Sequence, residues 1–501
     1  MASINLDLYL HVLTPVHVGG SDDKHLVEGL DYLIENGQVY IFDQKKLRKA
    51  IGNDSQYINA LEEGKAGINN LLRVRRIALS DISHSPKWIT GTASEIKACI
   101  KNGMNGKPYL PGSSIKGALR SMIFNKVFRN SGETVSDARN KKNSKGRPLP
   151  PEDFYLGNFQ DSLMRFIQVS DVYFDDVDTE ICNAKIFNLQ NNGRDKSWEG
   201  GWKHQLNGGT NNRFSPEGFT FAYESIPANS VGKFRLSFDE NLFRMASDSK
   251  AVKIESGVKS LFKGGFETTL RGVIQQHTQV YLHKEANFFS KNEYQVQESE
   301  SILGVINYLL DTNSTEAPVF RMASGSGFHS ITGDWQFRDH INTGINQRTN
   351  KISYKSRRLL FNEAGEGYSF TPMGFVQLCT SDYYEQHLKA KIIAAQAAAE
   401  AEALAAEKAR KEQEEAERYS AEEAKKPKWR TLDEVKKAGL LDGEVVGQQG
   451  FNVMIKPFVT GQENKTYLVR YAAGFPKGTI VEVKAVVNKN QIQLQPSIKE
   501  K

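Results

Sequence analysis

The chain has 501 residues, 39% of them hydrophobic and 25% charged, and a formal net charge of +6. This globular composition excludes wholesale disorder, and without a run of about 18 apolar residues we expect no membrane span. Three separated cysteines with no CxxC pair exclude a disulfide scaffold and a cysteine-based zinc site, and the N-terminus lacks a secretory signal, so we expect a cytoplasmic protein.

The first segment of the chain predicts short strands and a hairpin. Residues 4–12 alternate between apolar and polar side chains, as in a half-buried strand, and lead into a glycine-containing turn. The pair Asn36-Gly37 between two apolar runs is typical of a β-hairpin. A helix-rich stretch is expected over residues 43–80.

Residues 107–120, with the sequence KPYLPGSSIKGALR, form the most informative segment. They lead into an amphipathic helix, with Ser113 or Ser114 as the expected N-cap. Free backbone N–H groups and hydroxyls at the positive end of a helix form a phosphate site, and Lys116 and Arg120 reach further phosphates from one face. An ordinary capped helix is the alternative.

Two polar stretches predict loops. Residues 129–150 are basic and aperiodic, which indicates a mobile loop. Residues 188–214 are rich in Asn and Gly, and their Trp202 is expected either to contact RNA or to lie in a surface loop without such a contact. Short helices and strands with antiparallel hairpins surround these loops, which favours an α+β fold.

The C-terminal part differs in composition. Residues 383–426 lack Gly and Pro and are rich in Ala, Glu and Lys, which predicts a solvated helical spacer or a partner-binding coiled coil. Residues 427–501 hold 12 Lys and Arg against 7 Asp and Glu, a net of +5. Their five short apolar runs predict a small basic β-barrel similar to an OB-fold.

Aromatic residues of the predicted barrel have two interpretations. They either stack bases beside Lys456, Lys465 and Arg470, or they form the core of the barrel. The residues concerned are Phe451, Phe458, Tyr467, Tyr471 and Phe475.

Three motifs resemble those of the RAMP superfamily of CRISPR-associated proteins. They are Leu13–Gly20, Tyr109–Arg120 and the glycine-rich Phe320–Ser330, in this order. The length and the Ala-Leu-Arg-Ser variant of the second motif are most similar to the fifth Csm subunit of type III-A effector complexes. The resemblance does not extend to the helical spacer or to the barrel.

The resemblance implies two ferredoxin-like halves, similar to RNA-recognition motifs, within residues 1–382 and with a boundary near 215–235. It implies a non-catalytic subunit that binds CRISPR RNA and caps the 3′ end of the guide, aiding guide maturation and antiviral defence. The implied partners are guide RNA, target RNA, the backbone and small helical Csm subunits, and a host ribonuclease. No cofactor or metal is expected.

Contacts to RNA are expected from the glycine motifs, the start of the signature helix, the 129–150 loop and a basic run at 345–358. The residues are His17, Gly19, Gly20, Gly112, Ser113, Ser114, Lys116, Arg120, Lys141, Lys142, Gly325, Ser326, Gly327, His329, Arg348, Lys351, Lys355, Arg357 and Arg358.

An endoribonuclease is the alternative function. In related slicing subunits an Asp after the glycine turn cuts target RNA with a divalent metal, and Asp31 lies near that position. The Ser-Pro-Val that usually follows is absent here, and a polar hairpin residue is the other interpretation. His17 or His329 would instead serve a metal-free guide-processing enzyme as general acid or base.

Overall fold

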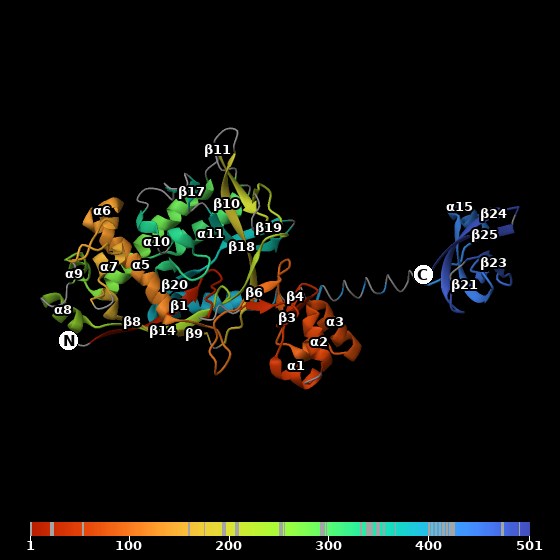
Figure 1. Cartoon of the computed structure of the whole chain (residues 1–501), viewed down its shortest axis with the longest axis horizontal. Coiled ribbons are helices and arrows are strands. Elements are labelled where there is room, and N and C mark those ends of the chain that lie inside the picture. The colour runs from red at the N-terminus through yellow and green to blue at the C-terminus, as the bar shows by residue number, and fades with distance from the viewer. Residues whose placement is uncertain are drawn as a thin grey trace. The chain divides into compact units, whose positions relative to one another are not determined.

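The computed structural model divides the chain into two compact units, Met1–Ala395 and Gln396–Lys501, here called unit 1 and unit 2. Figure 1 labels their helices and strands. The structure describes the chain except residues 1–2, 21–24, 53–54, 159–160, 175, 193–196, 206–209, 250–253, 255, 291–295, 297, 331–332, 337–343, 347–350, 354–355, 366, most of 399–425, 472–474, 490 and 501.

The first sheet of unit 1 has the N-terminal strand β1 near its centre. Its described strands lie in the order β15-β20-β1-β14-β9-β7, and β8 also pairs with β14. The alternation predicted for residues 4–12 is confirmed, because Leu8, Leu10 and Val12 on β1 point into the core. The bounds are β1 (Ile4–Val12), β7 (Tyr109–Leu110), β8 (Ile167–Val169), β9 (Val172–Tyr173), β14 (Val231–Phe238), β15 (Val319–Arg321) and β20 (Phe375–Thr380).

Two long helices, α5 (Gly112–Ser131) and α10 (Phe266–Ser290), supply much of the core of unit 1. Apolar side chains of α5 and the first half of α10 share one buried cluster with the first sheet, and the second half of α10 belongs to a second cluster. The other helices here are α7 (Pro151–Leu156), η1 (Leu163–Arg165), α8 (Glu240–Asp248), α9 (Ser256–Leu261), α12 (Gly327–Ser330) and η3 (Asp334–Gln336).

A buried ion cluster joins α5, α10 and η3. The Asp334 carboxylate is 1% exposed and accepts hydrogen bonds from Asn125 at 2.9 Å, Arg129 at 3.0 Å and Lys284 at 2.8 Å. Burial alone raises the pKa of Asp334, but the basic groups around it outweigh burial and hold that pKa below its ordinary value. The cluster ties elements that lie up to 209 residues apart in the sequence.

The second sheet of unit 1 packs on α10 and α11 (Ser299–Thr312). Its order is β12-β11-β10-β13-β6-β2 among the described strands, with β18 paired to β10 and β19 to β18. The bounds are β2 (His25–Val27), β6 (Glu95–Lys97), β10 (Glu180–Asn192), β11 (Ser197–Lys203), β12 (Thr210–Asn211), β13 (Phe221–Ser225), β18 (Ser356–Ala364) and β19 (Gly367–Pro372). A separate hairpin consists of β16 (Gly344–Asn346) and β17 (Lys351–Ser353).

The predicted loop at residues 188–214 is wrong, because β10 and β11 form an antiparallel hairpin there. Trp202 is 1% exposed and stacks on Phe370 with ring centroids 4.7 Å apart. Its ring is therefore core and not a contact for RNA. The physical reason is that burying an indole ring against β19 removes a large apolar area from water.

Residues 129–150 also have more secondary structure than predicted. Helix α5 continues to Ser131, and α6 (Val135–Arg139) begins with a capping box formed by Thr134 and Asp137. Lys142 and Pro148 form an isolated β-bridge. The capping box of Thr134 and Asp137 is a local signal in the sequence that the basic composition of the segment concealed.

A small helical module follows the first turn of the chain. It contains a three-stranded sheet in which β4 (Gln38–Ile41) pairs with both β3 (Tyr32–Glu35) and β5 (Lys87–Trp88). Its helices are α1 (Gln44–Ile51), α2 (Ser55–Glu62), α3 (Gly64–Arg75) and α4 (Leu79–Ile82). The predicted hairpin is confirmed, since Asn36 and Gly37 have φ of 50° and 71°, as its tight turn requires. The helices share one buried cluster.

The chain leaves β20 through α13 (Ser381–Tyr383) and the π-helix η4 (Tyr384–Leu388), and residues 389–398 continue as α-helix. The start of the predicted Ala-, Glu- and Lys-rich helix is thus confirmed. Most of its remainder lies outside the described residues.

Unit 2 is an antiparallel sheet with the order β23-β22-β21-β24-β25. Its two edge strands, β23 and β25, lie side by side, so the sheet is nearly closed into a barrel, as predicted. Helix α15 (Leu432–Ala438) carries a capping box of Thr431 and Glu434 and packs on β21 and β24. The strands are β21 (Leu440–Gln449), β22 (Asn452–Pro457), β23 (Tyr467–Arg470), β24 (Ile480–Asn488) and β25 (Gln491–Glu500).

The α+β class is confirmed, with helices and largely antiparallel sheets mixed along the chain. Each large sheet of unit 1 draws strands from both sides of residues 215–235. Two ferredoxin-like halves with a boundary there stay a prediction. None of the described helices is both long and apolar enough to cross a bilayer.

Candidate nucleic-acid interface

The signature helix α5 begins differently from the prediction. Pro111 is its N-cap and Gly112 its first residue, so Ser113 and Ser114 are not the cap. A Cβ atom on Gly112 would lie 2.2 Å from the Val169 carbonyl oxygen, which explains the glycine.

The positive end of α5 already faces a carboxylate. The Gly112 N–H donates to Asp171 Oδ1 at 2.8 Å, and the Ser114 N–H donates to the Pro111 carbonyl at 2.9 Å. These N–H groups are therefore occupied at the place where the sequence predicted a phosphate. The side chain of Ser113 is exposed there.

Lys116 and Arg120 differ in their surroundings although they lie one turn apart. Arg120 pairs with Glu152 at 3.3 Å and with Asp153 at 3.2 Å, both on α7. Lys116 forms no ion pair within the described part of the chain, and partial burial lowers its pKa. A Cβ on Gly117 would meet no atom within 4 Å, so there is open space beside Lys116 for a ligand.

The first and third motifs of the sequence meet in space. The Ser324 N–H donates to the His17 carbonyl at 3.0 Å, and the Gly374 N–H donates to the Pro15 carbonyl at 2.9 Å. His17 is 3% exposed, with Nδ1 at 2.7 Å from the Glu224 carbonyl oxygen. Its ring therefore ties the first motif to β13, its backbone carbonyl ties it to the third motif, and Gly19 beside it is exposed.

The glycine-rich loop of the third motif is closed by its own hydrogen bonds. The buried guanidinium of Arg321 donates to the Met373 carbonyl at 2.8 Å and to the Gly325 carbonyl at 3.0 Å. Gly325 and Gly327 have φ of 78° and 77°, which glycine adopts readily. Ser326 and His329 are buried, at 8% and 4% exposed, and Gly327 is exposed.

The two arginines that end the predicted basic run have different roles. Arg357 Nε lies 2.9 and 2.8 Å from the two Glu285 oxygens, and its guanidinium covers Phe288 at 4.2 Å, so it is part of the core. Arg358 is half-buried over Phe221 at 4.3 Å and lines a cavity of about 220 Å³ together with Gly325 and Gly327.

The remaining predicted contacts lie elsewhere. Lys141 pairs with Glu133 at 2.6 Å and covers the Phe154 ring at 4.4 Å, whereas Lys142 is exposed. Lys351 lies on β17, while Arg348 and Lys355 lie outside the described residues. Of the five basic side chains predicted in the run 345–358, the structure thus describes those of Arg357 and Arg358, and an RNA contact there stays a prediction.

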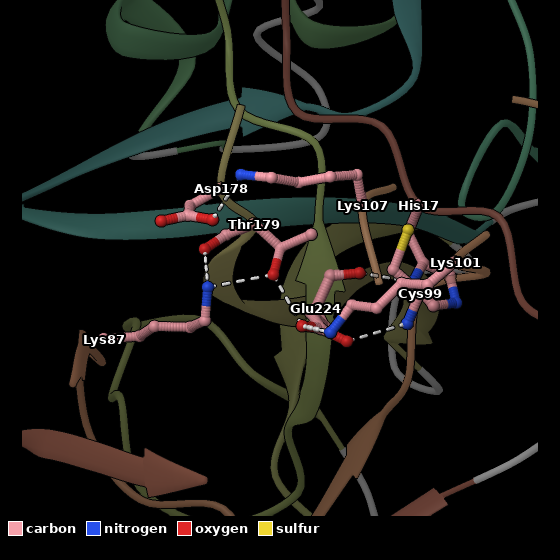
Figure 2. Close-up of polar contacts among 8 residues, drawn as sticks. All are labelled: His17, Lys87, Cys99, Lys101, Lys107, Asp178, Thr179 and Glu224. Atoms are coloured by element: carbon pink, nitrogen blue, oxygen red, sulfur yellow. Dashed lines mark hydrogen bonds and ion pairs between the residues drawn. The ribbon is translucent and has the colours of Figure 1, made fainter. Parts of the chain in front are cut away.

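A polar cluster around Glu224 was missed by the sequence reasoning (Figure 2). The Glu224 carboxylate, on β13, accepts from Lys101 Nζ at 2.5 Å, Thr179 Oγ1 at 2.5 Å and the Cys99 N–H at 3.1 Å. Burial raises its pKa, but Lys101 leads the groups that outweigh burial and lower it overall. The members of this cluster are spread from residue 87 to residue 224, and no sequence motif marks them.

The cluster forms part of the wall of a cleft of about 630 Å³. Lys87 Nζ donates to the Thr179 hydroxyl at 2.9 Å, and burial lowers the Lys87 pKa. Lys101 and Gly20 line the same cleft. Lys107 lies 3.4 Å from Asp178, another lining residue, and Figure 2 shows these groups around Glu224.

Asp31 also lines this cleft, but its carboxylate has a structural partner. Asp31 Oδ2 accepts the Val27 N–H at 2.9 Å, and the Asp31 carbonyl accepts the Phe42 N–H at 2.8 Å. Among the described residues no group of three or more His, Cys, Asp or Glu side chains is placed to hold a metal ion. The two hydrogen bonds of Asp31 are those of a turn-closing aspartate.

The comparisons with known proteins place the chain in a class. The family model of the RAMP superfamily matches residues 9–346, more than half of the sequence. The chain belongs to the RAMP superfamily, and the resemblance inferred from its three motifs is confirmed.

Two curated relatives bear the name CRISPR system Cms protein Csm5. The one from Methanocaldococcus jannaschii is 30% identical over 174 residues, 30% of this chain and 41% of the relative. The one from Streptococcus thermophilus is 24% identical over 183 residues, 33% of this chain and 50% of the relative. The chain thus matches half or less of the length of these relatives.

A solved structure shares the fold. A chain of the cryo-EM structure of a Csm–crRNA–target RNA ternary complex in a type III-A CRISPR-Cas system matches with a TM-score of 0.50 and 18% identity. The match covers 74% of this chain and 100% of the other.

Proposed function

We propose that the chain is a subunit of a type III-A CRISPR effector complex that binds guide RNA without cutting it. In this role it caps the 3′ end of the guide and aids guide maturation and antiviral defence in the cytoplasm. Its partners are then guide RNA, target RNA, the backbone and small helical Csm subunits, and a host ribonuclease. Two ferredoxin-like halves in residues 1–382 are part of the same proposal. Family membership and the Csm5 relatives support it.

One observation carries the proposal. Two family motifs meet at His17, beside the cleft that Lys87 and Lys101 line. His17 accepts the Ser324 N–H through its carbonyl and contacts the Glu224 carbonyl through its ring. The Glu224 carboxylate in turn holds Lys101 at the cleft. A polar cleft beside the glycine turn of the first motif, lined by Lys87 and Lys101 and also by carboxylates, offers hydrogen-bond donors for backbone contacts to RNA. Such contacts carry no sequence information and leave sequence reading to base pairing.

The endoribonuclease alternative has less support. His17 and His329 are buried, at 3% and 4% exposed, whereas a general acid or base must reach its substrate. Asp31 accepts a backbone N–H as a turn-closing residue does.

The binding experiment uses Lys116→Ala, because this lysine has no ion-pair partner among the described residues. Guide RNA affinity is measured by electrophoretic mobility over a series of salt concentrations. We expect weaker binding and a salt slope reduced by about 0.7, the value for one lost phosphate contact on a single strand. Lys126→Ala on the same helix, where Lys126 bonds Gln276 at 2.8 Å, is the matched control and is expected to bind as wild type.

Capping and cleavage are tested in the assembled complex with Mg²⁺. Protection of the guide 3′ end from a 3′ exonuclease, lost when this chain is omitted, is the expected result. Equal digestion with and without the chain contradicts capping. Cutting of guide or target RNA that Asp31→Ala abolishes would show that this subunit is a nuclease.

A further inference from the structure

One outward face of the barrel of unit 2 carries side chains that do not belong to the core of the barrel. Along β22, Val453 and Ile455 point into the core, and Asn452, Met454 and Lys456 alternate with them on the outside. The next strand, β23, adds Leu468 and Arg470 to this face, because Met454 is the register partner of Leu468 and Asn452 that of Arg470. We call this surface the β22–β23 face.

Aromatic rings lie at both ends of the β22–β23 face. At one end Phe451 is 71% exposed, and its carbonyl accepts the Tyr471 N–H, which places it beside Arg470. At the other end Phe458 continues the outward alternation, and Trp429, 54% exposed, packs on it edge to face at 5.3 Å.

These rings contribute nothing to the buried cluster of the barrel. Tyr467, Tyr471 and Phe475 do pack against that cluster, whereas Phe451 and Phe458 do not. The structure therefore divides the aromatic residues noted in the sequence into rings that pack on the core and two that lie outside it, Phe451 exposed and Phe458 half-buried. Rings that lie outside the core and gather on one face of a domain mark a binding surface.

Cations lie between the two aromatic ends. Lys456 and Arg470 are exposed, and neither forms an ion pair with another described residue. The acid nearest in register is Glu444, opposite Lys456 on β21. With the net charge of +5 over residues 427–501, this face is suited to an anionic ligand.

We propose that the β22–β23 face binds single-stranded RNA. Bases stack on Phe451 at one end and on the Trp429–Phe458 pair at the other, while Lys456 and Arg470 contact phosphates between them. Interleaved rings and cations on a barrel face suit a single strand, because every base has a face that stacks and the backbone is charged. The site lies beyond the residues that the family model matches, so it is separate from the proposed function.

The experiment uses the full chain and a fluorescein-labelled 12-nucleotide oligo(U) RNA that is unrelated to the guide. The face variant is Phe451→Ala/Lys456→Ala/Arg470→Ala. The control variant Val486→Ala/Lys484→Ala/Lys436→Ala removes the same charge and an exposed apolar side chain from β24 and α15. Fluorescence anisotropy over a salt series gives affinity, and 4-thiouridine crosslinking with mass spectrometry locates the contacts.

We expect crosslinks at residues 429–470 in wild type and in the control, and their loss in the face variant. Affinity of the face variant should fall at least about fivefold for the lost ring, and its salt slope by about 1.4 for two lost phosphate contacts. Crosslinks confined to residues 1–395, or a face variant that binds like the control, would overturn the proposal and leave the face to a protein partner.

The guide-binding variant keeps the two proposals distinguishable. Lys116→Ala should leave the crosslinks on the barrel unchanged, because Lys116 is in unit 1 and the β22–β23 face in unit 2. Loss of the barrel crosslinks in Lys116→Ala would show that the barrel has no site of its own.

Discussion

Cations have different roles in the two units of this molecule. In unit 1, Lys284, Arg357 and Lys101 each bind a carboxylate that is at most 6% exposed. In unit 2, Lys456 and Arg470 face solvent without an ion pair among the described residues. The lesson is that the number of positive residues does not locate an RNA surface. A cation without a carboxylate partner keeps its whole charge available to a phosphate, whereas a paired cation first has to lose or share its partner.

The largest loss of stability is expected from Asp334→Asn, in the buried ion cluster of unit 1. The substitution would remove the buried carboxylate that Lys284 and Arg129 both bind, and we expect unit 1 to lose about 3–5 kcal/mol of stability. Calorimetry of the full chain measures this, with the transition of unit 2 as an internal control. A loss below about 1 kcal/mol would mean that the buried charges of unit 1 behave like exposed ones.

Unit 1 is expected to lose stability in acid because of a buried histidine. Burial lowers the pKa of His277, next to Asp334, to about 4, against 6.5 when unfolded. The folded state therefore binds fewer protons between these values, so unit 1 is most stable above pH 6.5 and loses up to about 3 kcal/mol as the pH falls toward 4.

Melting temperatures of wild type and His277→Gln across this range test the acid prediction. The variant should melt with a flatter pH profile. A smaller slope should remain from His11, whose pKa burial also lowers. Parallel profiles for the two proteins would contradict the assignment to His277.

A smaller loss of stability is expected when a cation of unit 1 loses its carboxylate partners at the surface. Glu152→Gln/Asp153→Asn frees Arg120, whose side chain is 37% exposed, and should cost less than about 1 kcal/mol. Guide affinity should rise and depend more steeply on salt, because a cation becomes available to phosphate. Glu267→Gln, which releases Arg271 on α10, is the charge control and should leave guide affinity unchanged.

The smallest effect is expected in unit 2. Lys456→Ala/Arg470→Ala should leave the free energy of unfolding of unit 2 within about 0.5 kcal/mol of wild type, since neither side chain belongs to its buried cluster. Thermal denaturation followed by circular dichroism measures it. A clear loss of stability would show that these cations, like those of unit 1, are structural.

Several features could be predicted from the sequence because they depend on neighbouring residues. The alternation of residues 4–12 and the Asn36-Gly37 turn were predicted correctly. The five strands of the barrel were also predicted correctly, and the three motifs correctly predicted the family. Strand pleating and turn geometry act within a few residues, so local composition determines them.

The partners of the charged residues depended on tertiary structure alone. Glu285 lies 72 residues from Arg357 and Asp334 lies 205 from Arg129, so no local pattern reveals these pairs. The cleft around Glu224 and the division of the barrel aromatics into core and surface have the same origin. The sequence by itself determined the family, the class of fold and the local elements. Only the tertiary structure decided which cations remain open to RNA, because charge pairing and burial are set by contacts between distant segments.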